Sequence, residues 1–154
     1  PLFGDRGREL IGERFAVLDL DTVICGPIKP LVDNAGPFKI WGDTARGTPY
    51  NGSFYVMDAC ARRQVWDTFD RVSAPKRSLA NGYIGSDQGW IATVLGPGEA
   101  KFTTRDGIYS YRNHVERVNN FRLPANARMV MFHGAVDPWS PKAKCLGWVK
   151  QHYR

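Results

Sequence analysis

The sequence predicts an α/β fold, a mixed sheet flanked by helices, because short apolar strands alternate with helical segments along the chain. Its 154 residues suit one domain with a buried core, so residues 1–154 are expected to form a single domain. The hydrophobic fraction of 43% and the charged fraction of 23% are ordinary for a globular protein. This composition argues against a coiled coil, a collagen-like chain and a disordered chain.

The first elements follow from apolar runs and the residues that end them. Residues 8–13 are typical of the end of a short helix. Residues 14–21 form a continuous apolar run that stops at two acids, which predicts a strand buried on both faces. After Gly26-Pro27, residues 28–32 predict one helical turn, and residues 38–41 predict a second strand.

A loop, a strand and a helix are expected next. Residues 42–50 are polar and interrupted by glycine and proline, which indicates a loop. Residues 52–57 are rich in β-formers and predict a third strand. Apolar side chains at helical spacing predict a helix over residues 59–69.

The next helix is predicted from its capping residue. Residues 73–85 contain Pro75 and Gly82, so we expect a loop there. Ser86 can cap a helix that continues to Leu95, with Trp90 and its apolar neighbours as the buried stripe.

The C-terminal third contains one long irregular stretch. Residues 99–127 show no clear period except for a short strand at residues 108–111. Residues 128–132 predict a strand that ends at His133, and residues 141–151 predict a final helix.

Charge and cysteine content restrict the partners and the compartment. The 21 basic and 15 acidic residues give a net charge of +6, but no basic run exceeds two residues, so no nucleic-acid partner is expected. No apolar run approaches the roughly 18 residues of a membrane span, so no transmembrane segment is expected. The three cysteines are far apart and form no C-x-x-C pair, which favours a reducing, cytoplasmic location.

Two predicted strand ends carry side chains that bind metals. Asp19 and Asp21 close the first strand, and His133 closes the last one. Ligands of open α/β sheets bind beyond the carboxyl ends of the strands. Two carboxylates and an imidazole can hold Mn²⁺ or Mg²⁺, which commonly neutralises phosphate charge.

The Asp-x-Asp pair also allows a second interpretation. Residues 16–23 fit the opening motif of haloacid-dehalogenase-like phosphatases, with Asp19 as nucleophile and Asp21 as acid and base. That family also needs a late strand that ends in paired acids. The late strand of this chain ends in His133 instead.

Four segments, in order, carry a resemblance to a known family. They are residues 19–31 (DLDTVICGPIKPL), 50–53 (YNGS), 85–91 (GSDQGWI) and 132–139 (FHGAVDPW). With them the chain resembles metal-dependent glycosyltransferases of the GT-A fold, of the glycogenin and lipopolysaccharide galactosyltransferase type, especially small bacterial and phage members. The resemblance implies transfer of a sugar from a nucleotide-diphosphate sugar to a glycan, lipid or protein acceptor. A non-catalytic remnant that binds metal or sugar is the alternative.

The resemblance also implies roles for single residues. The implied metal ligands are Asp19, Asp21 and His133. The implied substrate-binding residues are Asp19, Asn51, Gly52, Gly134 and Trp139. Asp87 and Gln88 are the implied catalytic residues, because they would lie near the sugar and its reactive carbon.

Two features depart from the family. Its members carry a lysine before Pro-Trp that contacts the diphosphate, whereas this chain has Asp137. Either Lys142 or Lys144 supplies the charge, or this subgroup binds its donor differently. Only eighteen residues precede Asp19, where the family has a nucleotide-binding half. We therefore expect the C-terminal portion of a larger fold, whose exposed edge strand favours a homodimer.

Overall fold

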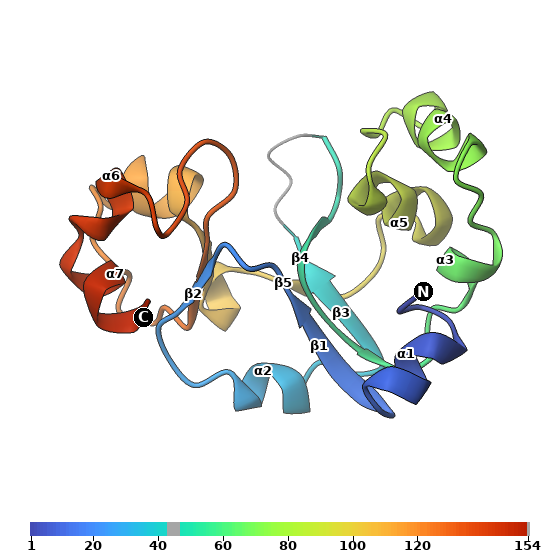
Figure 1. Cartoon of the computed structure of the whole chain (residues 1–154), viewed down its shortest axis with the longest axis horizontal. Coiled ribbons are helices and arrows are strands. Elements are labelled where there is room, and N and C mark those ends of the chain that lie inside the picture. The colour runs from blue at the N-terminus through green and yellow to red at the C-terminus, as the bar shows by residue number, and fades with distance from the viewer. Residues whose placement is uncertain (43–46, 154) are drawn as a thin grey trace. The chain divides into compact units, whose positions relative to one another are not determined.

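The computed structural model describes residues 1–42 and 47–153 and confirms the mixed α/β class (Figure 1). The chain divides into two compact units. Unit 1 comprises Pro1–Val17 and Val32–Lys101, and unit 2 comprises Leu18–Leu31 and Phe102–Arg154.

Unit 1 is built on a four-stranded sheet with the order β1-β4-β3-β5. The strands are β1 (Arg14–Leu18), β3 (Phe38–Trp41), β4 (Asn51–Asp58) and β5 (Lys101–Phe102). β3 and β4 pair antiparallel, with Phe38 opposite Met57 and an irregularity between Ile40 and Trp41. β4 is the longest strand and carries five consecutive buried residues, so it forms the centre of the unit.

The helices of unit 1 pack with this sheet around a core that is rich in aromatic side chains. They are α1 (Asp5–Leu10), α3 (Gln64–Asp67), α4 (Ser73–Ala80) and α5 (Asp87–Leu95). The residues of α2 (Lys29–Asp33) are divided between the two units, after Leu31. α5 packs against α3, α4 and β4, as Figure 1 shows for the green helices. The core includes Phe3, Phe15, Phe38, Ile40, Tyr50, Tyr55, Met57, Trp90 and Ile91.

Unit 2 has a three-stranded sheet of its own. Its strands are β2 (Thr22–Ile24), β6 (Ile108–Ser110) and β7 (Met129–Met131), in the order β2-β7-β6. The central strand β7 pairs antiparallel with β2 and parallel with β6. The other elements are the 3-10 turn η1 (Thr104–Asp106), the π-helix η2 (Tyr111–Glu116), α6 (Pro141–Lys144) and α7 (Gly147–His152).

The first predicted strand is shorter and more exposed than expected. It ends at Leu18, its Ala16 is exposed, and Leu20 beyond it is 90% exposed, so the prediction of a strand buried on both faces was wrong. The reason is its place in the sheet, because β1 is an edge strand. The expected exposed edge is therefore present, and pairing of two copies along it stays a prediction.

Two predictions in the middle of the chain were also wrong. The helix expected over residues 59–69 is only α3, because Cys60 has a left-handed φ of 63° that a helix cannot contain. The loop expected over residues 73–85 contains α4, since Pro75 lies in the first turn, where a missing N–H removes no helical hydrogen bond. The loop expected at residues 42–50 lies partly outside the described residues.

The C-terminal third contains more structure than its sequence indicates. The irregular stretch over residues 99–127 contains β5, η1 and η2 besides the predicted strand. The single helix expected over residues 141–151 is divided at Leu146, whose backbone is extended. No helix within residues 1–42 and 47–153 is long and apolar enough to cross a membrane.

Candidate functional site

The N-terminus of α5 is fixed by its cap and by a close backbone contact. The Ser86 hydroxyl accepts a hydrogen bond from the Gly89 N–H at 3.4 Å, as its sequence position predicts. A Cβ added to Gly89 would lie only 1.9 Å from the Ile84 carbonyl oxygen. Because the chain is packed this tightly, Asp87 and Gln88 have fixed places in the first turn.

The predicted Asn51-Gly52 turn lies against this helix start. The Gly52 N–H donates to Gln88 Oε1 at 3.3 Å, and a Cβ at Gly52 would lie 3.3 Å from Asp87 Oδ2. Asn51 Oδ1 accepts from the Ser53 N–H at 2.9 Å, which fixes the entry into β4. Two motifs that are far apart in the sequence thus form one polar cluster in unit 1.

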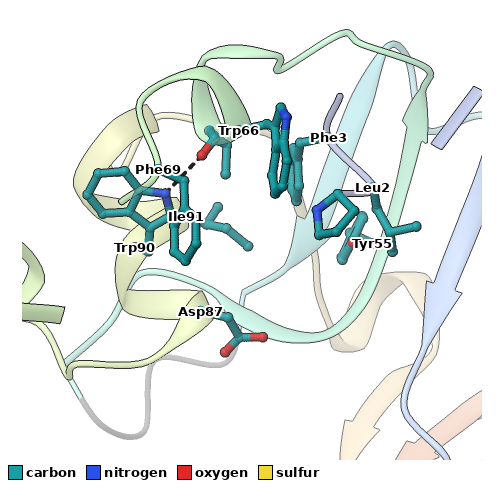
Figure 2. Close-up of a pocket in the computed structure, with 10 residues that line it drawn as sticks. Leu2, Phe3, Tyr55, Trp66, Phe69, Asp87, Trp90 and Ile91 are labelled. Carbon is teal, nitrogen blue, oxygen red and sulfur yellow. Dashed lines mark hydrogen bonds between the residues drawn. The ribbon is translucent and has the colours of Figure 1, made fainter. Parts of the chain in front are cut away.

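An aromatic cavity of about 250 Å³ lies beside Asp87 (Figure 2). The rings of Trp66 and Phe69 are stacked at 6.3 Å between centroids, and Trp90 is held by a 2.9 Å hydrogen bond from its indole N–H to the Val65 carbonyl. Among the side chains of residues 1–42 and 47–153, Asp87 is the only charged one that lines this cavity, and the N-terminal residue Pro1 lines it too. An apolar pocket with one polar side chain at its edge is typical of a site for an organic ligand.

In unit 2, Asp21 is surrounded by other charges. The Asp21 carbonyl accepts from the Phe132 N–H at 2.9 Å, which brings the residues before β2 beside those after β7. Burial raises the pKa of Asp21, and the negative charges of Asp19 and Asp137 raise it further, whereas His133 lowers it. The three predicted metal ligands therefore interact electrostatically, together with Asp137, whose role the sequence did not predict.

His133 is held by a buried hydroxyl. Its Nε2 lies 2.7 Å from Ser110 Oγ, and this oxygen also accepts from the Asn113 N–H at 3.0 Å. Ser110 is fully buried at the end of β6. No sequence spacing indicates this contact, because it depends on the parallel pairing of β6 with β7.

The acidic cluster has the chemistry of a cation site, but it is not closed around an ion. Among the residues that the structure describes, no three His, Cys, Asp or Glu side chains converge closely enough to hold a metal. Carboxylate oxygens and an imidazole nitrogen are nevertheless the donors that Mn²⁺ and Mg²⁺ accept. A cation would also offset the repulsion that raises the pKa of Asp21.

The loop after β7 and the helix α6 that follows it contain the remaining predicted residues. Gly134 has a φ of 117°, which favours glycine, and a Cβ there would lie 3.6 Å from Arg112 Nη1. Trp139 is 46% exposed, and its ring lies 6.4 Å from that of Tyr153. Lys142, one of the two expected phosphate contacts, forms an ion pair with Glu116.

Searches of protein families and of curated proteins found no match. Solved structures do match. They include the galactosyltransferase LgtC in complex with donor and acceptor sugar analogues, with a TM-score of 0.59 and 12% identity over 97% of this chain and 66% of that one. The glycosyltransferase GlyE of Streptococcus pneumoniae TIGR4 matches with a TM-score of 0.57 and 10% identity over 86% of this chain and 37% of its own.

The bifunctional glycosyltransferase WbbM matches with a TM-score of 0.51 and 12% identity over 85% of this chain and 30% of its own. The chain thus spans less than two thirds of the length of each of these proteins. These structures share a glycosyltransferase fold with the chain. As its four sequence segments predict, the chain has a GT-A-like glycosyltransferase fold.

Proposed function

We propose that this chain is the metal- and sugar-binding portion of a glycosyltransferase that uses a nucleotide-diphosphate sugar as donor. The observation that carries the proposal is the cluster of Asp19, Asp21 and His133 in unit 2 of a glycosyltransferase-like fold. Neighbouring carboxylates repel one another and so destabilise the folded chain. A bound divalent cation would neutralise this repulsion, which is why such an arrangement is typical of a functional site.

The proposed roles in unit 2 follow from the charges. Asp19, Asp21 and His133 would hold Mn²⁺ or Mg²⁺, which when bound neutralises the diphosphate and assists its departure. Gly134 would let the backbone approach the phosphates, since no side chain stands there. The exposed ring of Trp139 would contact the substrate from the same loop.

The proposed roles in unit 1 concern the sugars. Gln88 is held by the Gly52 N–H, so its amide has a fixed position beside Asp87. We assign Asp87 and Gln88 to the reacting sugar, and Asn51 and Gly52 to the turn that supports them. LgtC has also been solved as an active-site mutant in which a glutamine is replaced by glutamate, which supports an active-site role for a glutamine in this fold.

Metal titration tests the proposal. By calorimetry, Asp21→Ala and His133→Ala should each weaken Mn²⁺ binding about tenfold or more, because each removes a ligand. Glu9→Ala and His152→Ala serve as controls, since these residues lie outside the cluster. Unchanged Mn²⁺ affinity in both ligand variants would refute the metal site.

Turnover then separates the alternatives. Manganese-dependent hydrolysis or transfer of a UDP- or GDP-sugar supports the enzyme, and Mn²⁺ binding without turnover supports a non-catalytic module. Hydrolysis of p-nitrophenyl phosphate that is lost in Asp19→Asn would instead support the phosphatase.

A further inference from the structure

We propose that Arg112 binds the diphosphate of the donor and supplies the positive charge that Asp137 cannot supply. This inference rests on the proposed function for the identity of the anion, because a nucleotide-diphosphate sugar brings a diphosphate to the cluster. It assigns a phosphate contact to a residue outside the four segments that carry the family resemblance.

The first observation is a guanidinium nitrogen without a partner. Arg112 Nε is buried and forms no hydrogen bond within residues 1–42 and 47–153, where the only other such side-chain atom is Tyr111 Oη. Buried donors without an acceptor are rare and call for an explanation. The half-buried Arg62 of unit 1 is different, since it donates to both oxygens of Glu99, at 2.6 and 2.8 Å.

The second observation is the position of the side chain. Nη1 of Arg112 lies 3.6 Å from the place where a Cβ of residue 134 would stand, so the guanidinium lies against Gly134. Gly134 follows His133 directly, and the hydroxyl of Ser110, two residues before Arg112, contacts His133 Nε2 at 2.7 Å. The Arg112 guanidinium therefore lies beside the loop that carries a proposed metal ligand, and Ser110 in the preceding strand contacts that ligand.

The third observation is the backbone that holds Arg112. The residue lies near the start of η2, a π-helix that begins directly after β6. π-helical turns are uncommon and are frequent at functional sites. The π-turn thus provides an independent sign that this segment has a role beyond packing.

The chemistry of the anion fits a guanidinium. Its planar fork can donate two parallel hydrogen bonds to phosphate oxygens. Lys142, the nearby alternative in the sequence, is paired with Glu116. Asp137 lies close enough to Asp21 to raise its pKa, so it adds negative charge at the position where the resembled family has lysine.

Calorimetric titration of the whole chain with UDP and with inorganic pyrophosphate, at saturating Mn²⁺, tests the inference. Arg112→Gln should weaken both affinities about 10- to 100-fold, the effect of losing a charge-assisted hydrogen bond. Arg112→Lys should fall between this variant and the wild type, because it keeps the charge but loses the fork. Arg117→Gln, an exposed arginine that follows the same π-helix, should bind like the wild type.

The Mn²⁺ affinity and the unfolding temperature of each variant show whether the fold and the metal site are intact. Equal affinities for UDP and pyrophosphate in Arg112→Gln and the wild type would overturn the inference and leave the proposed function standing. If the wild type binds both anions through Arg112 but turns over no sugar nucleotide, the proposed transferase activity is refuted and the proposed anion site is supported. A wild type that binds neither anion would overturn both.

Discussion

The two units differ in whether their buried polar groups have hydrogen-bond or ion-pair partners. In unit 1 these groups are matched, since Arg62 pairs with Glu99, and the Tyr50 hydroxyl accepts from the Glu99 N–H at 2.9 Å. In unit 2, Asp21 is a carboxylate beside other carboxylates, and Arg112 Nε is a buried donor without an acceptor. Departures from local rules are expected at functional sites, so the mismatches in unit 2 agree with the proposed ligand site and the matches in unit 1 agree with a rigid support.

The largest expected effect tests unit 1 as a rigid support. Gly89→Ala places a Cβ 1.9 Å from the backbone oxygen of Ile84, where no flexible side chain can yield. An alanine inside a helix normally stabilises it by about 1 kcal/mol. Here we expect a loss of stability of about 3 kcal/mol, the upper end for overpacking, in chemical denaturation.

Gly98→Ala is the matched control for this substitution. A Cβ at Gly98 has no atom within 4 Å, so its unfolding free energy should stay close to that of the wild type. Equal stability of the two alanine variants would show that the start of α5 is not rigid.

Two arginines give the most direct comparison of the units. Arg62→Met leaves the Glu99 carboxylate, which is 15% exposed, without its partner, so we expect a loss of about 2 kcal/mol, below the roughly 3–5 kcal/mol of a fully buried pair. Arg112→Met removes a donor that has no acceptor, so stability should be unchanged or rise by up to about 1 kcal/mol.

Denaturant unfolding of both variants, in the absence of metal and nucleotide, provides the measurement. A loss in Arg112→Met as large as that in Arg62→Met would mean that Arg112 has a structural role, and the contrast between the units would disappear.

Much of the fold could be predicted because local signals agree with the tertiary structure. Ser86 does cap α5, and the apolar run before His133 is β7. Prediction failed where context overrides the local signal. Pro75 indicates a break but lies in a first helical turn, and the strand before Asp19 is apolar in sequence but lies at a sheet edge.

The candidate site was predictable only where the residues have a motif. The sequence indicated Asp87 and Gln88, and the structure places them beside Gly52. It gave no sign of Ser110 or Arg112, because a serine and an arginine in an irregular stretch have no diagnostic spacing. Their positions depend on the parallel pairing of β6 with β7, which a single sequence does not reveal.

Ser110 provides the next test, within unit 2 alone. Ser110→Ala removes the hydroxyl that contacts His133 Nε2, and loss of such an outer partner typically weakens metal binding about 10- to 100-fold. Titration with Mn²⁺ should show this loss, and ¹⁵N NMR of the imidazole should report a changed hydrogen bond at Nε2. In the His133→Ala background the same substitution should have little further effect, because both variants act through one ring. Additive losses would contradict the proposed role.

The smallest effect concerns Asp21 and has a sign that depends on pH. Its pKa is raised in the folded chain by burial and by Asp19, so the ionised carboxylate destabilises the fold above the unfolded pKa. In EDTA at pH 7, Asp21→Asn should therefore unfold at a higher temperature than the wild type. The gain should shrink as the pH falls to the ordinary aspartate value of 3.8 and vanish below it, where the wild-type carboxyl is neutral in both states. Added Mn²⁺ should reverse the order at pH 7, since an ion that binds only the folded wild type stabilises it. If the wild type is instead more stable than Asp21→Asn at pH 7 in EDTA, the charges around Asp21 are already balanced. The acidic cluster of unit 2 would then not differ from the matched groups of unit 1.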